Sequence, residues 1–351
     1  MLAPSINILP LTTIRKERLL PVPGKVVARQ GQKVAPNDVI AEANLNPEHL
    51  VLNVARGLGV SIEQANRLIQ RSVGDEINEG DLIAGPIGLA RRVVRAPVSG
   101  EVVLVGGGKL LLRVDKPPYE LRAGIGGAIT QLIPEFGAVI ETTGALAQGV
   151  WGNGKSDFGL LQVKMSTADD KLVPDQLDVS LRGTVVLGGY VGDPNIFRKA
   201  VEIPLRGLAL TCMTSALIPL VENLDLPVLV LEGFGKIPMN ALSYNLLTTH
   251  QNREVTINAD PFNRFTGTRP ELIIPLPTSR GTNPPLAIED FSVGKKVRVV
   301  RAPYIAKTGT IGTLFSELIE FPSGVRAPAA QVNLENGESV KIPLVNLEVV
   351  G

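Results

Sequence analysis

A short pattern that occurs twice near the start of the chain constrains the fold more than any other feature. The pattern is P-V-x-G-x-V-V, present at residues 21–27 and again at residues 97–103. Proline sets an extended backbone, glycine allows a tight turn or bulge, and the paired valines begin a strand. Because internal repeats indicate repeated architecture, the two copies predict two related β units.

Two further matches extend the repeat. Residues 31–41 and 74–84 both begin with glycine, carry aspartate at the eighth position and end in Ile-Ala. A weaker match aligns residues 95–102 with residues 122–129. The first of these patterns is typical of a turn-rich hairpin with an apolar strand on its far side.

These residues resemble the two halves of the barrel-sandwich fold of biotinyl and lipoyl carrier domains, over residues 21–43 and 74–114. Such carriers display a modified lysine on a hairpin between the halves. Residues 44–73, which separate the halves here, contain no such hairpin, and Lys164-Met165 lies outside the repeat. The resemblance therefore implies the fold without a bound cofactor, and we expect none.

The segment between the halves, residues 44–73, is predicted to be a helical insertion. Pro47-Glu48-His49 suits a helix start, with the helix running through Arg56. Ser61-Ile62-Glu63-Gln64 is a capping-box pattern, followed by apolar residues at helical spacing.

A glycine-rich segment at residues 149–156 matches the spacing of a nucleotide P-loop, G-x-x-x-x-G-K-S. Gly152, Gly154 and Lys155 are therefore candidates for binding an anion or nucleotide. A true P-loop follows a buried strand and precedes a helix, whereas residues 141–148 are a poor buried strand and residues 157–163 favour a strand. A tight hairpin with a packed Trp151 is the preferred interpretation.

Residues 178–275 change to an alternation of strands and helices, which indicates a three-layer α/β domain. The expected strands are 179–187, 207–212 and 227–232, and the expected helices are 195–200, 214–224 and 240–248. Ligands of parallel sheets bind beyond the carboxyl ends of the strands. Gly233, Gly235 and Lys236 are anion or nucleotide candidates there, and Cys212 is a candidate reactive thiol. The alternative for the glycine loop is a structural turn between strand and helix, and the alternative for Cys212 is a small buried side chain without reactivity.

Residues 262–270 then hold two phenylalanines, Phe262 and Phe265, and two arginines, Arg264 and Arg269. They suit either binding of a partner or anion, or internal fastening of a loop. Prolines then mark a linker at residues 276–290.

Residues 291–351 alternate charged and apolar side chains at 294–300 and contain an Asn336-Gly337 turn within a hairpin at 330–342. This segment resembles the KOW-type small β-barrel of ribosomal proteins and transcription elongation factors. The resemblance implies contact with RNA or protein. The basic residues that would contact nucleic acid are Lys295, Lys296, Arg298, Arg301 and Lys307.

Composition excludes several classes of protein. The chain has 35 Lys+Arg against 34 Asp+Glu, so the whole protein lacks the charge of a polyanion binder. Its single cysteine forms no intrachain disulfide, and no cysteine pair is available for zinc. No basic-apolar leader and no long apolar run are present, so we expect a cytoplasmic protein without a membrane span.

The sequence thus predicts a multi-domain, mainly β protein with an α/β segment. The expected parts are a barrel-sandwich-like domain at 1–165, the α/β domain at 178–275, the linker and the KOW-like barrel at 291–351. No catalytic residues and no metal ligands are indicated. We predict a non-enzymatic interaction or scaffold protein with a protein partner, and the sequence does not determine its oligomeric state. Two alternatives stay open: an RNA-binding transcription- or translation-associated factor acting through the barrel, and a nucleotide sensor or enzyme using the α/β loops.

Overall fold

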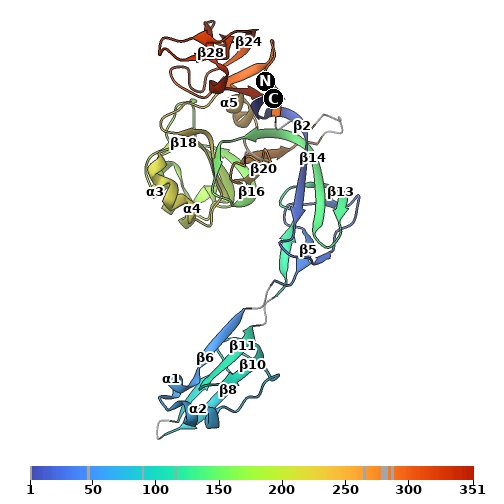
Figure 1. The fold of residues 1–351 in the computed structure, drawn as a ribbon, viewed down its shortest axis with the longest axis vertical. Coiled ribbons are helices and arrows are strands. Elements are labelled where there is room, and N and C mark those ends of the chain that lie inside the picture. Colours follow the sequence, from blue (N-terminus) through green and yellow to red (C-terminus); the bar gives the residue numbers. More distant parts are fainter. Residues whose placement is uncertain are drawn as a thin grey trace.

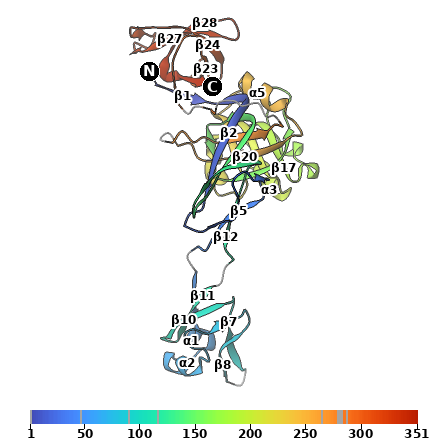
Figure 2. The same cartoon turned by 90° about the vertical axis from the view of Figure 1, so that its right-hand side faces the viewer.

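The protein is elongated and mainly β, with strands divided among several sheets and few helices (Figures 1 and 2). The computed structural model describes residues 2–45, 48–88, 91–114, 117–263, 266–277, 284–285 and 288–351. In both views a small module of residues 49–114 lies at one end of the molecule. We call residues 49–114 the distal module and the other described residues the base.

The base is organised by one large sheet. Its strand order is β15-β19-β18-β17-β16-β20-β21-β14-β13-β4, and β2 also pairs with β14. The strands are β2 (Ile8–Leu19), β4 (Lys33–Val34), β13 (Gly127–Ile133), β14 (Gly137–Gln148), β15 (Trp151–Gly152), β16 (Ser156–Val163), β17 (Thr184–Val191), β18 (Gly207–Met213), β19 (Val228–Phe234), β20 (Glu254–Asn258) and β21 (Glu271–Pro275). Strands from residues 1–165 and from residues 178–275 thus share one sheet, because β14 pairs with both β2 and β21.

The predicted alternation of strands and helices is present in the middle of this sheet. Strands β16 to β19 run parallel. Between and after them lie α3 (Asn195–Glu202), the short 3₁₀ helix η3 (Ser215–Leu217), α4 (Ile218–Glu222) and α5 (Ala241–Thr248). Every residue of β18 is buried, as expected of a central parallel strand. The first strand starts later than predicted, because Val179–Leu181 form a 3₁₀ turn (η2) capped by Asp178; a similar turn, η1, spans Pro174–Gln176.

The C-terminal residues form a separate sheet of order β22-β1-β29-β23-β24-β27-β28. Its strands are β1 (Leu2–Ile6), β22 (Ile288–Asp290), β23 (Lys296–Val299), β24 (Thr308–Leu314), β27 (Ala329–Leu334), β28 (Ser339–Pro343) and β29 (Leu347–Val350), with η4 (Leu344–Asn346) before β29 and the small pair β25 (Ile319–Glu320) and β26 (Arg326–Ala327) beside it. The predicted Asn336-Gly337 hairpin is present as β27–β28.

Two assignments made from the sequence need correction in this region. The first strand, β1, was expected within 1–165 but pairs with β29 and β22, and Ala3 packs into the core of the C-terminal sheet. The linker was expected to reach residue 290, yet Ile288–Asp290 is a strand; residues 278–283 and 286–287 lie outside the described residues.

The distal module has its own apolar core and two small sheets. Its elements are β6 (His49–Asn53), α1 (Val54–Leu58), α2 (Ile62–Leu68), β7 (Glu76–Ile77), β8 (Leu82–Ile87), β9 (Arg92–Arg95), β10 (Gly100–Gly106) and β11 (Lys109–Val114). The Ser61 helix cap is confirmed, since its hydroxyl accepts a hydrogen bond from Gln64 N. The helix expected from Pro47 is wrong: His49–Asn53 pair with β11 as a strand, and the helix begins only after the Asn53 cap.

Two of the three sequence matches, 31–41 with 74–84 and 95–102 with 122–129, are visible as repeated strand pairing. The P-V-x-G-x-V-V match is not, because residues 25–26 form β3 and pair with β5, whereas residues 100–106 form β10 and pair with β7 and β11. In the distal module the order is β7-β10-β11-β6, and in the base the matching order is β4-β13-β14-β2. Both β-hairpins carry a register shift at equivalent places, Val102/Leu104 and Ile129/Gln131. The neighbouring base sheet is β12-β5-β3, with β3 (Lys25–Val26), β5 (Val39–Ala43) and β12 (Tyr119–Arg122). We call the set β7-β10-β11-β6 the distal unit and the set β4-β13-β14-β2 the proximal unit.

The repeated residues make equivalent contacts in the two units. Asp38 accepts a hydrogen bond from Ala35 N at 2.8 Å, and Asp81 accepts one from Asn78 N at 3.0 Å. A Cβ added at Gly127 or Gly100 would overlap the carbonyl oxygen of the adjacent strand, at Glu141 or Arg113. Both glycines are therefore needed for close strand approach.

Candidate functional site

The loop at residues 149–155 is a sheet connection and not an anion nest. Its backbone N–H groups donate to carbonyls of neighbouring strands: Gly149 to Pro270 at 2.7 Å, Val150 to Val230 at 2.9 Å, Asn153 to Val228 at 3.3 Å and Gly154 to Ala259 at 2.7 Å. Gly152 pairs with Leu229, and Lys155 forms an ion pair with Asp225 at 3.0 Å. These amides are thus occupied, which argues against Gly152, Gly154 and Lys155 as a phosphate site.

A strand lies on each side of this loop, whereas a P-loop has a strand before it and a helix after it. Residues 141–148 belong to the long strand β14, so the expectation of a poor strand there is wrong. The strand β16, and no helix, follows the loop. Trp151 packs edge-on against Phe234 with ring centroids 6.0 Å apart, as the hairpin interpretation expects.

The second glycine loop, at residues 233–238, connects β19 to α5. Gly233 and Gly235 have φ of +139° and +106°, which favour glycine, and Gly235 N donates to Met213 O at 2.9 Å. At the helix start, the Asn240 side chain accepts from Ser243 N at 2.9 Å. The loop therefore has the backbone contacts of a structural strand-to-helix turn, and Lys236 is exposed on it.

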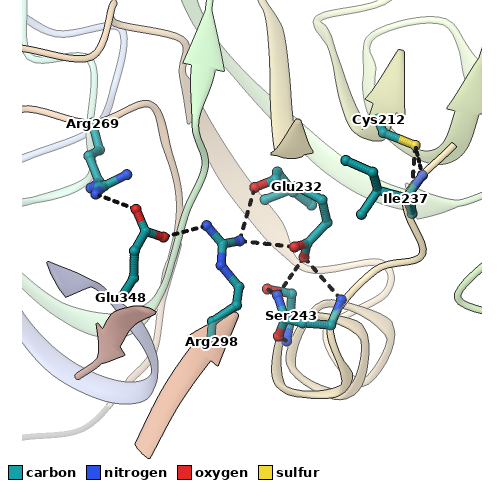
Figure 3. Close-up of polar contacts among 9 residues, drawn as sticks. Cys212, Glu232, Ile237, Ser243, Arg269, Arg298 and Glu348 are labelled. Atoms are coloured by element: carbon teal, nitrogen blue, oxygen red, sulfur yellow. Dashed lines mark hydrogen bonds and ion pairs between the residues drawn. The ribbon is translucent and has the colours of Figure 1, made fainter. Parts of the chain in front are cut away.

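Cys212 holds this turn from the neighbouring strand. Its Sγ donates to Ile237 O at 3.1 Å and accepts from Ile237 N at 3.4 Å (Figure 3). Burial raises the pKa of the thiol, more than the Ile237 hydrogen bond lowers it. A buried neutral thiol is a poor nucleophile, so the geometry favours the structural alternative for Cys212.

The five basic residues predicted to contact nucleic acid have different environments. Lys295 forms an ion pair with Glu289, and Lys307 pairs with Glu338 at 3.5 Å and stacks on Tyr304. Lys296 and Arg301 are exposed. Arg298 is 3 % exposed, so it is unavailable to nucleic acid.

Arg298 instead lies at the centre of a buried ion-pair network between the C-terminal sheet and the large sheet (Figure 3). Its Nη1 donates to Glu232 at 2.9 Å and its Nη2 to Glu348 at 2.7 Å. Arg269 donates to the other oxygen of Glu348 at 3.2 Å. Glu232 also accepts from Asn240 N at 3.0 Å. Four charged side chains from β19, the loop before β21, β23 and β29 thus join two parts of the base.

The network is electrically balanced, with two arginines and two glutamates. Burial disfavours the charged form of Arg298, but Glu232 and Glu348 outweigh it and raise its pKa. Burial likewise acts to raise the pKa of Glu348, while Arg298 and Arg269 lower it overall. The sequence had marked two members of this network, Arg298 as a nucleic-acid contact and Arg269 as a partner contact or loop fastening, whereas Glu232 and Glu348 were not predicted. Of the predicted 262–270 cluster, Arg269 fastens the loop in this way, and Arg264 and Phe265 lie outside the described residues.

An exposed aliphatic row crosses the outer face of the distal unit. Val51 of β6 is paired with Leu111 of β11, which is paired with Leu104 of β10. Val51 is 57 % exposed and Leu104 61 % exposed. The equivalent row of the proximal unit is Glu17–Val139–Gln131, whose two exposed ends are polar. The distal row therefore departs from its own internal copy by exposing apolar side chains.

No protein-family model matches the chain, and no curated protein matches it. Among the described residues no group of three or more His, Cys, Asp or Glu side chains is placed to hold a metal ion. Over the same part of the chain, no helix is long and apolar enough to cross a membrane.

Proposed function

We propose that the protein is a non-enzymatic modular interaction protein, in which the base holds the distal module out toward a protein partner. The observation that carries the proposal is the Val51–Leu111–Leu104 row. Exposed aliphatic groups on a sheet cost solubility, and the folded copy of the same unit has Glu17 and Gln131 at the two end positions of the row. Their retention at the far end of the molecule supports a binding role.

The row also favours a particular kind of partner. On either side of it β11 presents Lys109 and Arg113, with His49 opposite Arg113. Arg113 pairs with Glu101, whereas Lys109 has no acidic partner among the described residues. A protein segment that offers aliphatic side chains beside an acidic residue complements this face.

The internal copy supplies the test. Replacing Val51→Glu and Leu104→Gln together gives the distal row the end residues of the proximal row, which suit the fold. A partner recovered by crosslinking and mass spectrometry is purified and titrated against both proteins. We expect the double variant to bind at least tenfold more weakly, because an apolar contact is replaced by a buried polar one.

Val179→Glu is the matched control, since Val179 is a 78 % exposed valine of the base. It is expected to bind as the wild type does. Equal affinity of the double variant and the wild type would refute the proposal.

The finer fold assignments belong to this proposal. We infer a barrel-sandwich-like repeat in residues 1–165. Its two expected halves, 21–43 and 74–114, lie in the base and in the distal module, and the shared pairing order, register shifts and glycines of the proximal and distal units support the repeat. The antiparallel β23-β24-β27-β28 arrangement supports a KOW-like barrel, here serving as a protein-contact or packing domain. A cytoplasmic location suits a chain with a single, reduced cysteine. RNA and nucleotide binding have less support, because Arg298 is buried and the amides of the 149–155 loop are occupied.

A further inference from the structure

A cavity of about 280 Å³ lies in the base, where β2 and β14 meet the loop before β21. The volume is just below the roughly 300–1,000 Å³ typical of ligand pockets, so it suits a small molecule. Its polar lining includes Asn7, Gln148, Arg269 and Glu271, all at most 9 % exposed.

Curling of the sheet creates this cavity. Lys16 pairs in the backbone with Ile140, while Glu271 pairs with Gln148, eight residues farther along β14. In a straight strand that separation is about 26 Å, yet Lys16 and Glu271 form an ion pair. The bend falls at Gly144, where the register shifts and a Cβ would overlap the carbonyl oxygen of Ile274.

Three basic residues line the cavity, Arg15, Lys16 and Arg269, and each already has a carboxylate partner. Lys16 pairs with Glu271, and Arg15 pairs with Glu141 at 3.6 Å in an exposed contact. Arg269 is bound to Glu348 through a single N–H, and in the part of the chain that the structure describes its other guanidinium donors have no acceptor. The guanidinium is 6 % exposed, and its face stacks on the Phe262 ring at 4.6 Å, so the N–H groups at its edge that Glu348 does not use are what it has left to offer an anion.

A second, smaller cavity of about 60 Å³ continues the concave face on the other side of Lys16. It is lined by Thr256, whose buried hydroxyl has no hydrogen-bond partner among the described residues, and by the polar residues Ser156 and Asn258. Buried polar groups are normally satisfied by protein or by water. Lys16 lines both cavities. A ligand bound in the larger cavity therefore lies next to the smaller cavity, which is large enough for water.

We propose that the larger cavity binds a small carboxylate-bearing metabolite, with its carboxylate on Arg269 and its polar remainder near Gln148 and the Lys16–Glu271 pair. The guanidinium fork matches a carboxylate in two parallel hydrogen bonds. A dianionic phosphate is disfavoured, because Glu348 already lies against Arg269 and repels a second negative charge.

The test uses the full chain and a set of probes: acetate, lactate, succinate, citrate and L-glutamate, with succinamide and inorganic phosphate for comparison. Thermal stability and calorimetric titration are measured. At least one carboxylate is expected to bind saturably and raise the melting temperature, because a ligand that binds only the folded state stabilises it. Arg269→Gln is expected to weaken that binding about tenfold or more, from loss of a charged hydrogen bond.

Arg269 also belongs to the ion-pair network, so a second variant is required. Thr266→Trp narrows the cavity mouth at an exposed position away from the network and is expected to abolish binding. Arg206→Gln, which removes an exposed arginine paired with Asp157, is expected to bind as the wild type does. The proposal is overturned if no carboxylate binds, if succinamide or phosphate binds as tightly, or if Thr266→Trp binds normally.

Discussion

The proximal and distal units have the same pairing order but opposite surroundings. In the proximal unit the central hairpin continues into the large sheet, because β14 has twelve residues and reaches β21. In the distal unit the corresponding strand β11 has six residues, and the described pairings of its sheet stay within the module. One unit is thus fixed in a large core, while its copy is carried alone at the end of the molecule. The longer strand β14 is what joins the proximal unit to the large sheet, and the six-residue β11 makes no such connection among the described residues.

The ion-pair network lies in the base alone. Breaking it is therefore expected to give the largest difference in stability between the base and the distal module. Arg298→Leu leaves Glu232 and Glu348 buried without their shared partner, so we expect the base to lose about 3–5 kcal/mol of unfolding free energy. Calorimetry should show a lowered base transition and an unchanged distal transition.

Arg206→Leu is the matched control, because Arg206 pairs with Asp157 on the surface at 3.2 Å. A change within about 0.5 kcal/mol is expected. Equal effects of the two substitutions would show that the network contributes no more than a surface pair.

The equivalent glycines test the repeat itself. Gly100→Ala places a Cβ on the carbonyl oxygen of Arg113, and Gly127→Ala places one on that of Glu141. We expect each to cost about 1–3 kcal/mol from overpacking. Gly100→Ala should lower only the distal transition and Gly127→Ala only the base transition.

Gly31→Ala is the comparison for overlap. Nothing lies within 4 Å of its added Cβ, so its loss of stability measures only the backbone strain of a φ of +80°. If Gly100→Ala lowers both transitions together, the distal module does not fold as an independent unit.

Acid should weaken the base through Glu348. The folded pKa of Glu348 is lowered, so its stabilising contribution is complete above the ordinary glutamate pKa of about 4.3 and is lost as pH falls through the folded value. The loss is smaller than that from Arg298→Leu, because the Arg298–Glu232 pair persists. Denaturant titrations between pH 7 and pH 3 measure it, and the Arg298→Leu protein should show a weaker pH dependence.

The smallest expected effect compares the two aspartate turns. Asp38→Ala and Asp81→Ala each remove one side-chain acceptor of a backbone N–H, at a cost of about 1 kcal/mol. The two losses should agree within about 0.5 kcal/mol, one in each transition. A loss in only one unit would indicate that the shared motif has different roles in the two copies.

Local sequence patterns determined much of this protein. The repeated glycines and aspartates predicted the two units, the apolar runs with intervening helical periods predicted β17 to β19 and α3 to α5, and Ser61 and Asn336-Gly337 marked a helix cap and a hairpin. Each of these features depends on residues close in the chain, where backbone preference and side-chain period act directly.

Only the tertiary structure decided the contacts between distant segments. The placement of Leu2–Ile6 beside Leu347–Val350, the Arg298 network and the cavity near Lys16 each join residues separated by tens to hundreds of positions. Arg298 was misassigned as a nucleic-acid contact for the same reason: alternation along a strand shows which side chains share a face, but not whether that face meets water or a buried glutamate. Burial is a property of what packs against a strand, and a single strand's sequence does not contain it.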